Sequence, residues 1–449
     1  MPFLPDLIVR SRRVVTPGST RAASVHIRGG KIAGVLAFDD VPPGCPLDEA
    51  GEAALIPGVV DTNVQVSEPG LPGWHGFENT TRAAAAGGVT TVIDMPLNRV
   101  PATTSADAIH AKRAAAAGKC YVDVGFWGGV TAGNDRELAP MREAGVFGFK
   151  CWLATSGTGE CPPVSEADLR VAMPAIARLS LPLLVHAELP GPIDAALARS
   201  RADDRFLSRF WPAARRARRR YRSYLESRPK AAENEAVALM IALCREFRTP
   251  IHIVHLSSSD ALSPLFHARS AHLPITVETC PHYLSLVAEE IADGRAAFTC
   301  APPIRERENR EFLWAALAGG LIQMVVSDHS QAGISSLQLS LSATWTEAVA
   351  RGYTLSQIAD WMCRRPARLG GLLRKGAIEP GYEADLVMFN PDTAFTVGAT
   401  TLQPGHASTP YLGRRLRGVV ERTYLGGQRI YERARAIERP LGRVLARTH

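Results

Sequence analysis

Apolar runs rich in β-branched residues recur along the middle of the chain and alternate with Ala-rich stretches. Between residues 57 and 371 the apolar runs read PGVVDT, VTTVIDMP, YVDVGFWGG, VFGFKCW, LPLLVHAE, TPIHIVHLSS, LPITVETCPHYL and IQMVVSDHS. Stretches of helical character, such as FENTTRAAAAG, SEADLRVAMPAIARL and ENEAVALMIALCREF, lie between several of them. Apolar strands that alternate with helices are typical of a parallel sheet buried on both faces. About eight such runs predict an α/β fold, a closed (β/α)8 barrel over residues 57–371.

Both ends of the chain carry a different, alternating pattern. At the N-terminus DLIVRSRRVVT and ASVHIRGGKIAGV alternate polar and β-branched residues, and Gly29-Gly30 predicts a hairpin turn. After Leu373 the strand pattern returns in KGAIEPGYEADLVMFNP and GVVERTYLGGQRIYE. We therefore expect one small β-sandwich-like domain built from residues 1–56 and 372–449.

Composition excludes two other classes of protein. The 449 residues are 46% hydrophobic and 21% charged, which excludes a disordered chain. No apolar run reaches the roughly 18–20 residues that cross a bilayer, and the first residues are too charged for a signal peptide. We expect a cytoplasmic location. The eight cysteines form no C-x-x-C pair and are predicted to be free thiols.

The net charge of +7 is concentrated in one Arg-rich run, AARRARRRYRSYLESR, which ends at Arg228. Such a run can form a nucleic-acid-binding patch, but no nucleic-acid-binding motif accompanies it. A solvated helix face is the better interpretation. We expect a small molecule as the partner, and neither nucleic acid nor a membrane.

Four polar side chains stand at the ends of predicted strands. They are Lys150 after VFGF, His186 in LPLLVHAE, His255 in IHIVHLSS and Asp328 in IQMVVSDHS. Each has a structural alternative, because a core imidazole can be hydrogen-bonded, a Lys can snorkel and an Asp can cap a helix. The C-terminal ends of barrel strands meet at one mouth, so the four together indicate a functional site.

These residue types suit metal-assisted hydrolysis. Imidazoles and oxygen ligands bind Zn²⁺ and similar ions. Such an ion activates water and polarises a carbonyl group while a nearby carboxylate accepts the proton. Asp328 is the candidate base. Lys150 is protonated near neutral pH and would act as a ligand only if it is modified or if its pKa is depressed.

With these residues located, the chain resembles the cyclic amidohydrolases, the group of dihydroorotases, hydantoinases and allantoinases, and among them the allantoinases most. The similarity runs nearly end to end through IPGVVDTNVQVSEPG, GFKCWLATSG, HIVHLSS, ETCPHYL, CAPPIRE and SDHS. It implies hydrolytic ring opening of a cyclic ureide or amide, such as allantoin to allantoate. It also implies a carboxylated Lys150 that bridges two metal ions, with His186 and His255 on one ion and Asp328 on the other, where Asp328 also acts as the base.

The same resemblance places substrate contacts near Asn98, Ser156 and Ala301, and homo-oligomers are usual in the family. His282 belongs to the family block ETCPHYL and is expected to support the mouth structurally. His75 is interpreted as a surface residue, with a replacement metal ligand as the alternative. Cys151 is expected to be a packed thiol.

The chain departs from the family at the first metal motif. Where relatives have His-x-His, this sequence has Asn63-Val64-Gln65. Neutral amides bind Zn²⁺ poorly compared with imidazole. We therefore expect at most one divalent metal, zinc or a similar ion, per chain, with no metal as the alternative. The loop after Ser330 is also shorter than in relatives, and Leu71 stands where relatives often have Arg.

Three functions stay open at this point. The first is an active hydrolase with an impaired or mononuclear metal site, which the four retained residues favour. The second is a catalytically inactive homologue that pairs with or regulates an active partner. The third is an enzyme repurposed for a related cyclic or carbamoyl compound, for example ring closure in a biosynthetic pathway.

Overall fold

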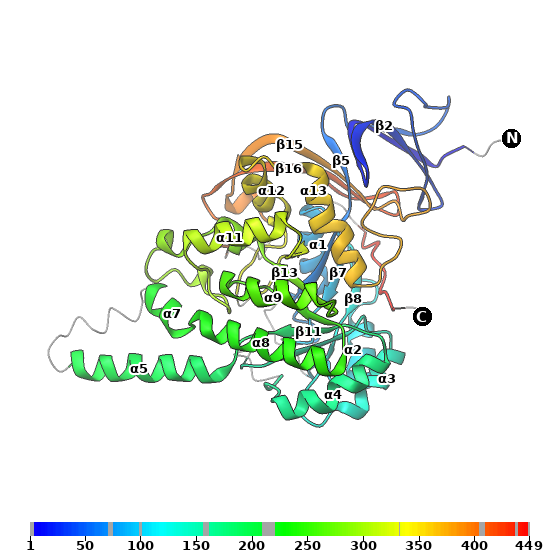
Figure 1. Cartoon of the computed structure of the whole chain (residues 1–449). Helices are drawn as coiled ribbons and strands as arrows, with labels where there is room; N and C mark the ends of the chain where they lie inside the picture. The colour runs from blue at the N-terminus through cyan, green and yellow to red at the C-terminus, as the bar shows by residue number, and fades with distance from the viewer. Residues whose placement is uncertain are drawn as a thin grey trace.

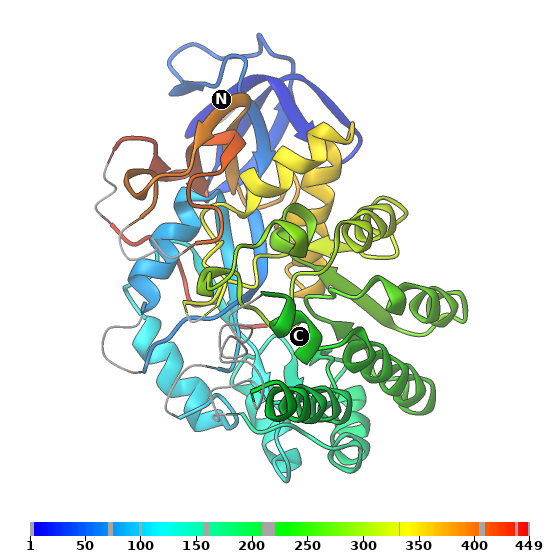
Figure 2. The same cartoon turned by 90° about the vertical axis from the view of Figure 1, so that its left-hand side faces the viewer.

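The chain folds into a (β/α)8 barrel with a mixed β-sheet packed beside it (Figures 1 and 2). The computed structural model describes residues 4–70, 75–97, 101–155, 161–208, 221–331, 333–403, 409–435 and 439–447. The predicted fold class is confirmed. Among the described residues, no helix has both the length and the apolar character needed to cross a membrane.

Each of the predicted apolar runs contains a parallel strand of the barrel. The strands are β6 (Val59–Val64), β7 (Val89–Asp94), β8 (Asp123–Phe126) followed by β9 (Gly128–Gly129), β10 (Phe149–Trp152), β11 (Leu183–His186), β12 (Ile251–Ile253), β13 (Ile275–Thr279) and β14 (Met324–Val325). Hydrogen bonds join β6 to β8 in one group and β9 to β14 in another. The barrel closes where Val64 and His329 form a parallel bridge.

Helices follow most of the strands and surround the barrel (Figure 2). They are α1 (Phe77–Ala86), α2 (Ala106–Ala116), α3 (Leu138–Glu143), α4 (Glu166–Arg178), α5 (Pro190–Ser208), α7 (Tyr221–Ser227), α8 (Lys230–Phe247), α9 (Leu262–Ser270), α10 (Pro281–Ser285), α11 (Arg307–Ala318), α12 (Ser340–Ala350), α13 (Leu355–Ala359) and α14 (Arg365–Leu369). Helix α4 begins at a capping box, in which the Ser165 hydroxyl accepts from the Asp168 backbone and the Asp168 carboxylate accepts from the Ser165 backbone.

Strands from both ends of the chain form the second sheet, so blue and orange ribbons lie side by side in Figure 1. They are β1 (Leu7–Thr16), β2 (Ser19–Arg28), β3 (Lys31–Leu36), β4 (Leu47–Glu49), β5 (Ala54–Pro57), β15 (Leu386–Thr396), β16 (Arg415–Leu425) and β17 (Gln428–Glu432). The two ends meet where β5 pairs antiparallel with β15. Gly29 and Gly30 both have positive φ and form the predicted turn between β2 and β3.

The last described segment of the chain leaves this sheet and lies on the barrel. Val444 forms a parallel bridge with Val124 of β8, and the Arg443 guanidinium bonds the buried Asp123 carboxylate at 3.0 Å. The small domain was expected to include everything from residue 372 onward. The backbone of this segment hydrogen-bonds Val124 of β8, and the domain bounds stay a prediction.

Candidate active site

A cavity of about 240 Å³ opens at the C-terminal ends of the barrel strands. Six positions singled out in the sequence line it: Asn63, Gln65, Lys150, His186, His255 and Asp328. They come from five strands of the barrel or from the residues that follow them, since Asn63 and Gln65 both belong to the end of β6. The structure therefore brings together the four retained residues and the two positions where the family's imidazoles are missing.

The local backbone turns two of these residues toward the cavity. His255 follows β12 with φ 41° and Asp328 follows β14 with φ 47°, so both lie in the left-handed region. Residues other than Gly rarely adopt this conformation, and such strain concentrates at functional sites. Both residues line the cavity, so two of the six described non-Gly residues with positive φ lie at its edge.

The imidazoles of His186 and His255 lie next to each other in the lining of the cavity. The Nδ1 atom of His186 lies 3.1 Å from the Nε2 atom of His255. Burial lowers the pKa of both imidazoles, so both rings are neutral at pH 7. Each ring therefore has a nitrogen lone pair available.

A buried carboxylate fixes the orientation of His186. The Nε2 atom of His186 lies 2.9 Å from Oε2 of Glu188, which also accepts from the Arg228 guanidinium at 2.6 Å. Burial alone would raise the pKa of Glu188, but His186 and Arg228 outweigh it and lower this pKa to about 2. Glu188 is thus ionised and holds the proton of His186 on Nε2. The Nδ1 lone pair is left pointing at His255.

Lys150 and Asp328 line the same cavity and carry opposite charges. Burial lowers the pKa of the Lys150 ammonium and raises the pKa of the Asp328 carboxyl. The Nζ atom of Lys150 lies 5.1 Å from the centre of the Trp152 ring. A lowered pKa increases the fraction of neutral amine, which is the form that reacts with CO₂ to give a carbamate and a proton.

Asn63 and its neighbours form a polar network beneath the cavity. The Asn63 amide nitrogen donates to Oε1 of Glu278 at 2.7 Å. The other oxygen of Glu278 lies 2.8 Å from Nε2 of His252, and the backbone N–H of His255 donates to Oε1 at 3.3 Å. Glu278 therefore connects Asn63, which stands at one of the two substituted metal-ligand positions, to His252 on β12 and to His255 just after it.

The arrangement of His186 and His255 fits a metal ion. Two imidazole nitrogens on a tetrahedral zinc ion, with bonds of about 2.0–2.1 Å, lie roughly 3.3 Å apart, close to the observed 3.1 Å. The buried Nδ1 atom of His255 has no hydrogen-bond partner within the described residues. Without a cation, Nε2 of His255 either donates its proton to the Nδ1 lone pair of His186 or turns its own lone pair toward it.

The remaining sequence-predicted residues divide into three groups. Ala301 lines the cavity, and its contact with substrate stays a prediction. Leu71, Asn98 and Ser156 lie outside the described residues. His75 is absent from the cavity lining and is buried, so its interpretation as a surface residue is wrong; its backbone N–H donates to Oε1 of Gln331 at 2.6 Å.

Sequence reasoning missed several residues of the site. Glu188, Glu278 and Tyr224 were not singled out, although Glu188 lies only two residues after His186 and Glu278 lies in the family block ETCPHYL. The Arg-rich run was interpreted as a solvated helix face, which is wrong for Arg228. Its side chain is 16% exposed and is paired with Glu188, because a buried carboxylate requires a cation. Half of the run, residues 213–220, lies outside the described part of the chain.

The chain belongs to the amidohydrolase family, whose model matches residues 54–430. Enzymes of the hydantoinase and allantoinase type within this family typically use divalent metals. The sequence is 45% identical to the allantoinase of Streptomyces avermitilis over 98% of this chain and 99% of that protein. It is 38% identical to the allantoinase of Saccharomyces cerevisiae over 89% of this chain and 87% of that protein. The chain is thus an allantoinase-like cyclic amidohydrolase, as the motifs predicted.

Solved structures show the same relationship. The L-hydantoinase (dihydropyrimidinase) from Arthrobacter aurescens superposes with a TM-score of 0.90 at 28% identity, covering 99% of this chain and 100% of that one. A D-hydantoinase gives a TM-score of 0.85 at 25% identity over 98% of both chains. The barrel with its accompanying β domain is therefore shared with cyclic amide hydrolases over nearly the whole chain.

Proposed function

We propose that this chain hydrolyses an amide bond in the ring of a cyclic ureide, and that allantoin is the first substrate to test. The observation that carries the proposal is the facing pair of neutral imidazoles, His186 and His255, beside Lys150 and Asp328 in one cavity. The named allantoinase relatives supply the substrate class.

We propose a mononuclear metal site in which Lys150, as its carbamate, and the two imidazoles would hold one divalent ion. Zinc suits this set of nitrogen and oxygen donors. When bound, such an ion acts as a Lewis acid that polarises a substrate carbonyl group. Asn63 and Gln65 offer only weak amide oxygens at the position of the family's other ion, so a second ion at that position is not part of the proposal.

Asp328 is the proposed general base. It lines the cavity beside Lys150, so its carboxylate can accept a proton from an attacking water molecule and return it to the ring nitrogen that leaves. Water thereby adds to the carbonyl carbon, the C–N bond of the ring breaks, and the product carries a new carboxylate and a new N–H. A base with a raised pKa is suited to both transfers near neutral pH.

The cavity suits a small polar ring. Its lining combines the amides of Asn63 and Gln65 with the apolar faces of Leu97, Trp152 and Ile334. Amide side chains can hydrogen-bond to the N–H and C=O groups of a ureide, and the apolar faces exclude water from the reacting bond. A homo-oligomer, pairing with an active homologue and a cytoplasmic location stay predictions.

The direct test is turnover of allantoin, hydantoin, dihydrouracil and dihydroorotate by the purified chain, without metal and with added Zn²⁺, Mn²⁺ or Co²⁺. Ring opening of allantoin that requires a metal supports the proposal. If none of the four rings is opened under any condition, the proposal is wrong and the inactive-homologue interpretation is favoured. Closure of a carbamoyl compound without ring opening would favour the repurposed enzyme instead.

A further inference from the structure

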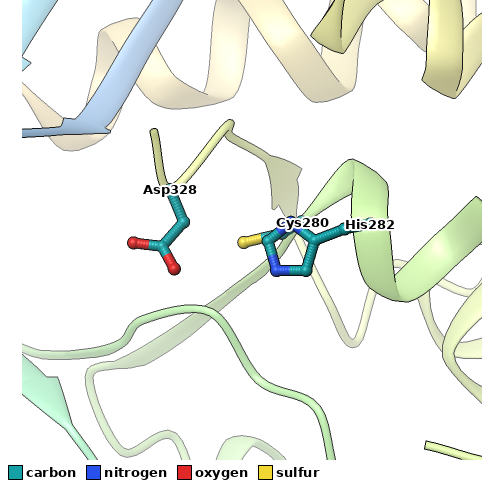
Figure 3. A group of neighbouring side chains, drawn as sticks. All are labelled: Cys280, His282 and Asp328. Carbon is teal, nitrogen blue, oxygen red and sulfur yellow. The ribbon is translucent and has the colours of Figure 1, made fainter. Parts of the chain in front are cut away.

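Two buried side chains and one half-buried side chain outside the His186–His255 pair converge on one point at the barrel mouth. The sulfur of Cys280, an imidazole nitrogen of His282 and a carboxylate oxygen of Asp328 all lie within 4.8 Å of one another. Figure 3 shows the sulfur and the imidazole on the same side, facing Asp328. We propose that these three side chains form a thiolate-containing cation site that is separate from the ligand set of Lys150, His186 and His255.

The topology of the barrel explains why the three side chains meet. Strands β13 and β14 are parallel neighbours, with Thr279 paired to Val325. Cys280 follows β13 directly and caps the short helix α10, which contains His282. Asp328 follows β14, and its left-handed backbone turns it out of the strand direction. The residues after two adjacent strand ends are thereby brought together.

The state of His282 is the second, independent observation. Its imidazole is fully buried, and neither ring nitrogen has a hydrogen-bond partner within the described residues. The ring contacts Tyr283 at a centroid distance of 4.2 Å. Aromatic packing satisfies neither nitrogen, and an unsatisfied buried nitrogen destabilises the fold. A cation between His282, Cys280 and Asp328 would satisfy one of them.

The three ligand atoms of this site favour a particular class of metal ion. A thiolate, an imidazole and a carboxylate are ligands of Zn²⁺ and Co²⁺, and three protein ligands leave a fourth position open. Ligand atoms on a tetrahedral ion lie roughly 3.3–3.8 Å apart, so the observed spacing of up to 4.8 Å requires only a small approach of the side chains. Coordination takes the thiolate form of Cys280, so one proton is released to solvent for each ion bound.

This site compensates for the substitutions at the family's His-x-His motif. Asp328 lacks the imidazoles that the resemblance predicts at positions 63 and 65, but ligand atoms of Cys280 and His282 lie within 4.8 Å of its carboxylate. The site shares Asp328 with the proposed hydrolytic centre and does not depend on hydrolytic activity. If both sites fill, the chain holds two ions rather than the single ion expected from the sequence.

Cobalt spectroscopy tests the site directly, because only a thiolate ligand gives a sulfur-to-cobalt charge-transfer band in the near ultraviolet. The full-length protein is stripped with a chelator and reloaded with Co²⁺, and metal content is measured by elemental analysis. We expect the band in the unaltered chain. The variant Cys280→Ser should lack the band and should bind one equivalent of metal less. Cys300→Ser is the matched control, because Cys300 is a buried thiol that lines the cavity, and it should keep the band.

Two further variants separate this site from the proposed hydrolytic centre. His186→Ala should lose one metal equivalent and keep the band, whereas His282→Gln should weaken the band while His186 and His255 keep their ion. Cobalt bound to the unaltered chain without a charge-transfer band overturns the proposal, and this result does not depend on whether any variant folds. A band that persists in Cys280→Ser, or that disappears in a folded His186→Ala protein, overturns it as well.

Discussion

The side-chain amide of Asn63 donates a hydrogen bond of 2.7 Å to the carboxylate of Glu278. Position 63 is one of the two at which the resemblance to the family predicts a metal-binding imidazole. Asn63 is fully buried, and its bond to Glu278 satisfies a carboxylate that also accepts from His252 and from the backbone of His255. The replaced residue is therefore integrated into the structure beside the retained ligands.

Restoring both imidazoles should increase metal binding. In the variant Asn63→His/Gln65→His, the ring at position 63 can donate one N–H to Glu278 and direct its other nitrogen into the cavity. We expect one additional equivalent of zinc per chain and a rise in kcat/KM for allantoin of at least about tenfold. Elemental analysis and steady-state kinetics check this.

The control for added imidazoles is Thr155→His, because Thr155 also lines the cavity but is not a family ligand position. It should change neither metal content nor rate. Equal gains in Thr155→His and in the double variant would show that any imidazole in the cavity recruits metal, and would contradict a specific role for positions 63 and 65.

Replacement of Glu188 by Gln should weaken metal binding at His186. The neutral amide no longer enforces the Nε2–H tautomer, and it leaves Arg228 without its carboxylate at 2.6 Å. We expect metal affinity to fall by about 10–100-fold, measured by competition with a chromogenic chelator. Glu166→Gln, which alters an exposed ion pair on α4, should leave affinity unchanged, and an unchanged affinity in Glu188→Gln would exclude the positioning role.

Removal of the Asp328 carboxylate should abolish most hydrolysis. Asp328→Asn keeps the size of the side chain and removes the base, so kcat should fall by roughly 10²–10⁴-fold. Metal content is measured in the same samples, so that loss of the base is distinguished from loss of an ion. Ser330→Ala changes another cavity residue and should retain most of the activity. Turnover by metal-loaded Asp328→Asn at the original rate would exclude Asp328 as the base.

The barrel and the cavity-lining ligands could be predicted from the sequence, for a physical reason. Parallel strands buried on both faces leave a continuous apolar run, and strand-end polar residues such as Lys150, His186 and Asp328 must meet at one mouth. The sequence could also predict that the two ends of the chain form one sheet, because both ends carry an alternation of polar and apolar residues. These features depend on local sequence and on the geometry of a closed barrel.

The supporting residues could not be predicted in the same way. Arg228 lies in a highly charged run that is typical of a solvated helix, and only the tertiary structure shows that Glu188 binds it. His282 and Cys280 carry no spacing signal of a metal site, because their third partner, Asp328, comes from the next strand. The contact of the C-terminal segment with β8 likewise depends on backbone hydrogen bonds that leave no trace in hydrophobic periodicity.

A buried cation between two carboxylates should contribute strongly to the free energy of unfolding. The Nζ atom of Lys375 lies 2.9 Å from Asp123 and 2.5 Å from Asp385, and all three side chains are buried. In Lys375→Met both carboxylates lose the buried ammonium and Asp123 keeps only Arg443, which should cost about 3–5 kcal/mol. Urea unfolding at pH 7 measures this. The control Lys119→Met removes a half-exposed partner of Glu68 and should cost less than about 1 kcal/mol.

The same substitution should change how stability depends on pH. Burial alone would raise the pKa of Asp123, but Lys375 and Arg443 outweigh it and lower this pKa. The stabilisation from Asp123 is therefore present above the unfolded pKa of about 3.9 and is lost as pH falls through the lower folded value. Without Lys375 the folded carboxylates take up protons more readily, so the deficit of Lys375→Met should be largest at neutral pH and shrink toward pH ~4. Unfolding curves of both proteins across that range decide the matter, since a deficit that is constant with pH would mean that Lys375 stabilises the fold by packing rather than by its charge.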